Sequence, residues 1–147
     1  MSGRSVAAIP FVLTVGVVTL AARSHAPGGP AFQGTGWTLP PDVETTRNPL
    51  TVDAKVIAAG KALFMEKCQR CHGPGGLGDG PDGDPDAQED MNLTNPARAD
   101  KNPDGTVFYK AWNGRKKPKM PAFKDELTKD QVWTIVSYVQ TLRKTAK

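Results

Sequence analysis

Cys68-Gln69-Arg70-Cys71-His72 is the stretch of sequence that decides the fold. Two cysteines three positions apart, followed directly by a histidine, form the C-x-x-C-H attachment signature for c-type haem. Each thiol can bond to one vinyl group of the porphyrin, and the chain then turns His72 towards the iron as an axial ligand. The motif therefore predicts a single covalently bound haem c, attached through Cys68 and Cys71.

Three other kinds of site use two cysteines at this spacing: a thioredoxin-like dithiol, half of a zinc site and a small-loop disulfide. A structural zinc site needs four ligands, but the chain has no further cysteine and His25 is its only other histidine. A thioredoxin-like site belongs to a βαβ unit, and no strand-like stretch precedes Cys68. Haem attachment is therefore the interpretation that the sequence favours.

The composition is that of one soluble domain with an appendage, with 147 residues, a net charge of +4 and 23% charged residues. So modest a charge argues against the strongly basic face of a nucleic-acid-binding protein. Residues 73–78 satisfy the pattern G-x-G-x-x-G, but no strand precedes them and we expect no dinucleotide there. Asp82, Asp84 and Asp86 imitate a calcium loop, yet Ala87 stands where that loop needs glycine, so calcium is not expected.

Residues 1–26 resemble a targeting segment, because an uncharged and mostly apolar stretch runs from Val6 to Ala22. As a helix this stretch would span about 25 Å, slightly less than the ~30 Å hydrocarbon core of a bilayer. It fits both a signal peptide, cleaved after Ala21, and an N-terminal membrane anchor. With Arg4 on the inner side, either reading places the domain at the periplasmic, extracytoplasmic side of the cytoplasmic membrane, tethered there if the segment is retained.

Residues 27–50 are predicted to be a Pro/Gly-rich linker, because prolines and glycines cluster there without apolar periodicity. A flexible chain of this length has a reach of about 25 Å, which suits a tether. Phe32 and Trp37 differ from the rest of the segment and could pack on the domain or on a partner. Residues 51–147 are then the predicted globular domain.

The globular domain is predicted to be all-α, since no stretch alternates convincingly between apolar and polar residues. Asp53 is a suitable N-cap for a helix over residues 54–67, which runs directly into the cysteines. A short helix is expected over residues 106–112, ending at Asn113-Gly114.

The closing helix has the clearest pattern, because Thr128 and Gln131 form a T-x-x-Q capping box at its start. Its apolar stripe consists of Val132, Ile135, Val139 and Leu142. Residues 73–104 are predicted to be irregular, and so long a loop is unusual unless it wraps a ligand. Large apolar side chains are few, so we expect the chain to be poorly folded without its haem.

A proximal histidine leaves one iron position open, and the methionines are candidates to fill it. Met65 falls within the first predicted helix, where such a residue usually fills the core. Met120 stands in Pro118-Lys119-Met120-Pro121, and the prolines on both sides stiffen an extended loop suited to holding a thioether. Met120 is the predicted second axial ligand beside His72, with Met91 or an open position as the alternatives.

Residues 52–143 resemble a class I monohaem c-type cytochrome of the bacterial type, with His/Met-ligated haem. The motifs that carry the resemblance are Gly60-x-x-x-Phe64-x-x-x-Cys68, Cys71-His72-Gly73, Gly80-Pro81, Met120-Pro121-Ala122-Phe123, and a closing helix with Ile135 and Tyr138. The resemblance implies the cytochrome c fold, a small helical domain wrapped around a covalent haem, here preceded by an N-terminal hydrophobic helix.

The resemblance also implies two residue roles. Gly60 and Phe64 would lie where the first helix crosses the last, and glycine would let the two backbones approach closely. The Pro81 carbonyl would accept the Nδ1 proton of His72, which fixes the ring and raises its basicity as a ligand. The acidic insert at residues 82–90 departs from the family's pattern.

These features predict a one-electron carrier and not an enzyme, because two axial protein ligands leave no iron position for a substrate. The expected partners are respiratory or photosynthetic redox proteins, or a larger membrane complex of which the chain is a subunit. The alternative is a haem enzyme or gas sensor with an open or displaceable sixth ligand. A basic cluster beside Met120 fits either a solvated loop or a docking patch for an acidic redox partner, and consists of Arg115, Lys116, Lys117 and Lys119.

Overall fold

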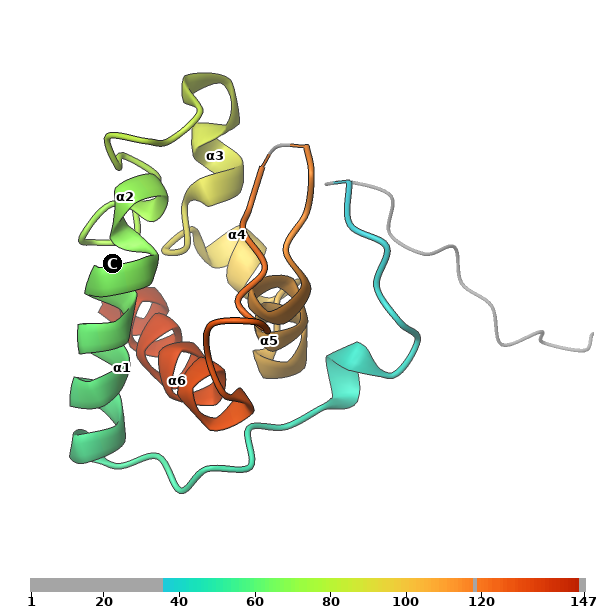
Figure 1. Ribbon diagram of the computed structural model, residues 1–147, viewed down its shortest axis with the longest axis vertical. Helices are drawn as coiled ribbons and strands as arrows, with labels where there is room; N and C mark the ends of the chain where they lie inside the picture. Colours follow the sequence, from blue (N-terminus) through green and yellow to red (C-terminus); the bar gives the residue numbers. More distant parts are fainter. Residues whose placement is uncertain (1–35, 118, 146–147) are drawn as a thin grey trace, which may run out of the picture.

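Helix α1 (Ala54–Lys67) begins and ends at the predicted residues. The side chain of Asp53 caps it by accepting a hydrogen bond from the backbone N–H of Val56 at 2.8 Å. The helix leads through Cys68 into α2 (Gln69–His72), so the attachment motif follows the last turn of α1 (Figure 1). The structure, a computed structural model, describes residues 36–117 and 119–145.

Helix α6 (Lys129–Thr145) closes the domain, and its predicted capping box is confirmed. The backbone N–H of Thr128 donates to Gln131 Oε1 at 2.8 Å, and the backbone N–H of Gln131 donates to Thr128 Oγ1 at 3.2 Å. The predicted apolar stripe also faces inward, since Val132, Ile135 and Val139 are at most 3% exposed.

Helices α1 and α6 cross at Gly60, as the resemblance implied (Figure 1). A Cβ atom at Gly60 would lie 2.2 Å from the carbonyl oxygen of Thr134, so only glycine allows this approach. One turn further along, the rings of Phe64 and Tyr138 pack at a tilt of 60° with their centroids 5.3 Å apart. The crossing therefore fixes the direction in which α1 delivers the cysteines.

Helix α5 (Asp104–Asn113) packs against α6 and starts two residues earlier than predicted. It ends as expected at Gly114, whose φ of 62° is in the left-handed region that favours glycine. These three long helices enclose one core, whose fully buried apolar members include Phe64, Val132 and Val136.

The stretch predicted to be irregular, residues 73–104, contains three very short helices between its turns. These are the 3-10 helix η2 (Pro85–Ala87), α3 (Gln88–Met91) and α4 (Pro96–Ala99). Asp84 and Asn95 cap two of them by accepting hydrogen bonds from the N–H groups of Asp86 and Ala97, both at 3.0 Å. In the part of the chain that the structure describes there is no strand, which confirms the all-α prediction.

Residues 36–50 of the predicted linker lie on the domain. The short 3-10 helix η1 (Val43–Thr45) packs against α5, with Val43 buried. Asn48 Nδ2 donates to the Trp133 carbonyl at 3.2 Å and to Ser137 Oγ at 2.9 Å, which joins this segment to α6.

The predicted targeting segment and the first part of the linker lie outside the described residues. Within residues 36–117 and 119–145, no helix is long and apolar enough to cross a bilayer.

Candidate functional site

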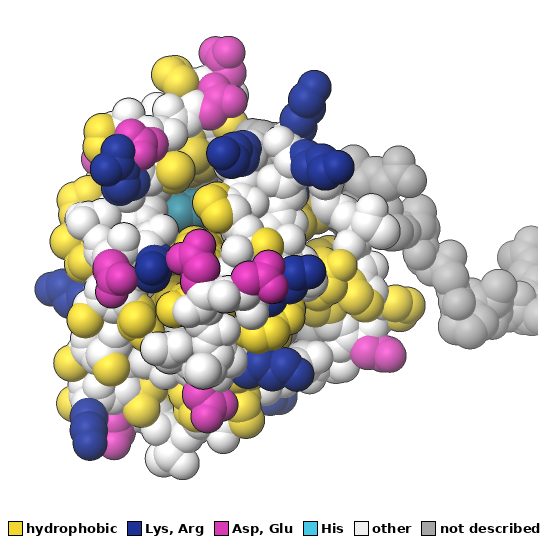
Figure 2. All heavy atoms as spheres, viewed as in Figure 1, with side chains coloured by type: hydrophobic (Ala, Val, Ile, Leu, Met, Phe, Trp, Pro, Cys, Tyr) yellow, Lys and Arg dark blue, Asp and Glu magenta, His cyan; other side chains and the backbone are white. Residues whose placement is uncertain are grey.

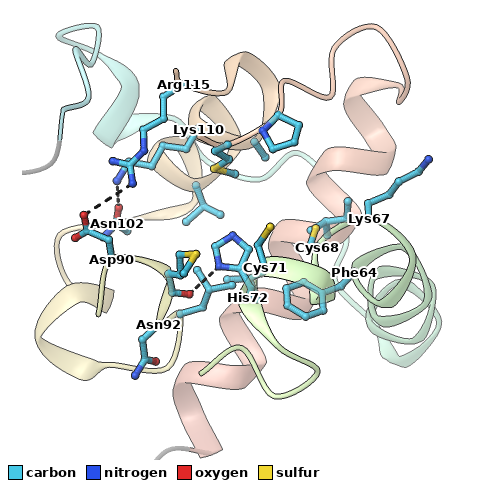
Figure 3. A pocket seen from close by; sticks show the side chains of 18 of the residues that line it. Phe64, Lys67, Cys68, Cys71, His72, Asp90, Asn92, Asn102, Lys110 and Arg115 are labelled. Carbon is cyan, nitrogen blue, oxygen red and sulfur yellow. Dashed lines mark hydrogen bonds and ion pairs between the residues drawn. The ribbon is translucent and has the colours of Figure 1, made fainter. Parts of the chain in front are cut away.

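A cavity of about 480 Å³ opens between α1, α5, α6 and the 73–104 segment, a size typical of small-molecule and cofactor sites. Both cysteines, His72 and Met120 lie on its walls, and Figure 3 shows the cysteines and His72 facing the same space. Much of the remaining wall is apolar and is formed by Phe64, Val107, Ala111, Phe123, Ile135 and Val139.

The two cysteines lie on one helical turn, because the backbone N–H of Cys71 donates to the Cys68 carbonyl at 3.2 Å. Both are unpaired thiols. Cys68 packs against the core, and burial raises its pKa to about 12, with a smaller contribution from Cys71. Cys71 Sγ lies 3.6 Å from the carbonyl oxygen of Asp82. The two thiols are thus held one helical turn apart at the cavity wall.

One ring nitrogen of His72 is hydrogen-bonded to the protein, and the other can bind a metal. Its Nδ1 lies 2.7 Å from the carbonyl oxygen of Met91. A carbonyl can only accept, so Nδ1 must carry the proton. Burial lowers the pKa of His72, so the neutral ring has its lone pair on Nε2. This is the state in which an imidazole binds a metal.

The partner of Nδ1 corrects one prediction, because Pro81 was expected to supply this carbonyl. Pro81 is exposed. The next residue, Asp82, is held against α2 by its backbone N–H, which donates to the Arg70 carbonyl at 2.7 Å. That hydrogen bond ties the start of the acidic insert to α2, and the insert then forms η2 and α3. The carbonyl that reaches His72 is therefore that of Met91 at the end of α3.

The backbone of Met120 is fixed by two hydrogen bonds to the backbone of Arg115. Its N–H donates to the Arg115 carbonyl and its carbonyl accepts from the Arg115 N–H, both at 2.9 Å. Three residues later, the N–H of Phe123 donates to the Ala111 carbonyl at 3.1 Å. The loop is thus closed on itself and tied to α5. Of the other candidates, Met91 also borders the cavity, whereas Met65 packs against the core, as predicted for a residue of the first helix.

The end of the cavity opposite the cysteines is polar. In Figure 3 the side chains of Lys110 and Arg115 point towards those of Asn102 and Asp90. Lys110 Nζ donates to Asn102 Oδ1, and Arg115 Nη2 lies 3.8 Å from Asp90 Oδ2. Arg98 pairs with the same carboxylate at 2.7 Å.

This end of the cavity has a hydrogen-bond donor that could bind an anion. Arg143 lies on the wall, and its buried Nε has no hydrogen-bond partner. An apolar slot with two thiols on one side and surplus cations on the other fits a haem, which has an apolar ring, two vinyl groups and two carboxylates. The sequence pattern singled out neither Lys110, Arg98 nor Arg143, because their α5, α4 and α6 positions carry no local motif.

The basic cluster beside Met120 divides into two parts. Lys116, Lys117 and Lys119 are exposed, and Figure 2 shows Lys and Arg side chains gathered over this loop between α5 and α6. The Arg115 side chain is only 10% exposed, because it turns inward to Asp90 and under the ring of Trp37. Arg115 therefore belongs to the cavity wall, and its inward position does not support the predicted role in docking.

Comparison with known proteins agrees with the geometry of the site. No curated protein matches the chain significantly. Residues 57–143, more than half of the chain, match the family described as Cytochrome c. The chain therefore belongs to the cytochrome c family, whose covalently bound haem c serves as an electron carrier.

Proposed function

We propose that the protein carries single electrons on one haem whose iron is ligated by His72 and Met120. The observation that carries the proposal is the presence of a neutral imidazole with a defined tautomer and a thioether on a closed loop, both on the walls of the cavity that holds the cysteines. The haem supplies the one-electron chemistry, and ligation by a thioether raises its reduction potential relative to two imidazoles. The residues keep ligand positions nearly constant between the two oxidation states.

The absorption spectrum of the oxidised protein tests the ligand set. The parent should show the sulfur-to-iron charge-transfer band, and Met120→Ala should lose it. Met91→Leu is the matched control, because Met91 acts on His72 through its backbone carbonyl, which the substitution keeps. A band that survives in Met120→Ala would show that another thioether is the ligand and would refute the assignment of Met120. A parent protein that binds carbon monoxide readily would favour the enzyme or sensor and overturn the proposal.

We further propose that Lys116, Lys117 and Lys119 steer an acidic redox partner towards the exposed side of the pocket. These three ammonium groups are exposed and adjoin the Met120 loop, and long-range attraction of this kind is screened by salt. With anionic hexacyanoferrate(III) as oxidant, Lys116→Glu/Lys117→Glu should slow electron transfer and flatten its salt dependence.

The control for this experiment is Lys55→Glu/Lys61→Glu, which changes the net charge equally on the exposed face of α1. A cationic cobalt complex as oxidant should show the opposite trend with the loop variant. Equal effects of the two double variants would refute local steering.

The proposed place of action is the extracytoplasmic side of the cytoplasmic membrane, between respiratory or photosynthetic partners or within a larger complex. The support is the apolar stretch between Val6 and Ala22, which suits export whether it is cleaved or kept. N-terminal sequencing of the native protein after separation of membranes distinguishes a free shuttle from a tethered one. Recovery of the haem-free chain from the cytoplasm alone would contradict this location.

A further inference from the structure

The segment before α1 contributes to the cofactor cavity although it precedes the matched family region. Residues 37–50 lie ahead of residue 57, where the family match begins. They are fixed to the domain at two points that do not border the cavity. Gly105 of α5 leaves room for the Val43 carbonyl, which would lie 2.1 Å from a Cβ there, and Asn48 bonds to α6. We call residues 37–50 the strap.

The N-terminal residue of the strap places an aromatic ring at the cavity. Trp37 lies on the cavity wall, with Lys110 Nζ 5.5 Å and the Arg115 guanidinium carbon 5.0 Å from its ring centroid. Both distances are within the range of cation–π attraction. One indole therefore covers the two cations that reach into the polar end of the cavity.

The charges around Lys110 do not balance. The charged groups that act on it are the cations Arg115, Arg98 and Arg143 and the single carboxylate Asp90. Burial, followed by these cations, lowers the pKa of Lys110 to about 8, even though Asp90 opposes the shift. A half-buried cluster of this kind is stabilised by added negative charge, and the two carboxylates of a haem are the anions that the cavity would receive.

We propose that the strap completes the cofactor pocket, with Trp37 closing a carboxylate-binding subsite formed by Lys110 and Arg115. This proposal rests on the proposed function, since it requires a haem in the cavity. Trp37 acts as a positioning residue, because it holds the two cations against the carboxylates and excludes water from them. Cations in a dry site favour the reduced iron, which carries less positive charge, so the strap raises the reduction potential.

The experiment measures the one-electron equilibrium of purified, haem-loaded variants against a reference redox couple. Trp37→Ala should shift this equilibrium towards the oxidised form by roughly three- to tenfold, where tenfold equals about 59 mV for one electron. Trp37→Phe retains an aromatic face and should restore most of the parent value. Thr38→Ala, an exposed neighbour in the strap, is the matched control and should change nothing.

A second arm asks whether Trp37 acts through the cations. In a Lys110→Gln/Arg115→Gln background, Trp37→Ala should have less than half of its original effect on the equilibrium. If Trp37→Ala does not accumulate with haem, the Lys110→Gln variant alone is measured, and it should also shift towards the oxidised form. A full effect in the double background, or parent values in Trp37→Ala or in Lys110→Gln, would overturn the proposal.

The spectrum separates failure of this inference from failure of the proposed function. A parent protein with the His/Met spectrum but without the Trp37 effect keeps the carrier and refutes the subsite. A parent protein without covalent haem refutes both.

Discussion

Substitution of Gly60 by alanine tests the crossing of α1 and α6, on which the delivery of the cysteines depends. The added Cβ would lie 2.2 Å from the Thr134 carbonyl oxygen and 3.0 Å from Tyr138 Cβ, whereas ordinary contacts begin at 3.4 Å. The nearest obstacle is a backbone oxygen, which cannot rotate away. The two helices must therefore separate by about 1 Å, which loosens tight packing along the crossing.

Two effects of opposite sign decide the outcome. Helix propensity alone predicts that Gly60→Ala stabilises the protein by about 1 kcal/mol. Overpacking against a rigid neighbour costs about 1–3 kcal/mol, and a backbone obstacle belongs at the upper end of that range. The tilted contact between Phe64 and Tyr138 also weakens as the helices separate. We expect a net loss of about 2 kcal/mol in the free energy of unfolding.

The assay is guanidinium unfolding of the haem-loaded protein, followed by helical circular dichroism. Ala59→Gly is the matched control, because Ala59 is the exposed neighbour in α1 and reports propensity without packing. It should lose about 1 kcal/mol. A Gly60→Ala protein as stable as the parent, or more stable, would show that the close approach is not required and would refute the reasoning.

Three further measurements address the closing helix, the strap and the polar end of the cavity. Thr128→Ala removes the oxygen that accepts from the Gln131 N–H and should lower the free energy of unfolding by about 1 kcal/mol, while Thr128→Ser should retain most of it. Asn48→Ala removes both hydrogen bonds to α6 and should cost about 1 kcal/mol, with faster amide exchange at Val43 as the specific sign of a loosened strap. Lys110 has a pKa lowered to about 8 by burial, and carboxylates of a bound haem would raise it towards the ordinary value of about 10.4. Loss of its proton would remove a cation from the wall of the cavity that would hold the haem, so the reduction potential should fall within that pH window in the parent and stay level in Lys110→Gln.

Local patterns predicted the elements whose causes are themselves local. Asp53 and the Thr128–Gln131 pair marked two helix starts correctly, because capping depends on residues within one turn. The C-x-x-C-H motif indicated the wall of the cavity for the same reason, since the two cysteines and His72 lie within five residues and about one helical turn of each other. Periodicity then placed the stripe of α6 on the core.

The structure departs from the predictions where the position of a group depends on distant parts of the chain. Pro81 has the right place in the sequence to face His72, but the acidic insert brings the Met91 carbonyl there instead. Arg115 stands among exposed lysines in the sequence, yet Asp90 and Trp37, both remote along the chain, draw its side chain inward. A run of like charges does not reveal which of its members has a buried partner.

The strap shows why composition alone misjudges such a segment. A segment with prolines and glycines and without apolar periodicity cannot form a core of its own, and residues 37–50 have no such core. They need none, because single groups attach to surfaces that the domain already offers: Val43 on α5, Asn48 on α6 and Trp37 over two cations. A small domain with few large apolar side chains gains from an added wall residue such as Trp37 at its cofactor site. A segment with the composition of a linker can therefore form part of the pocket wall. In the sequence, its aromatic residue Trp37 is the feature that indicates this role.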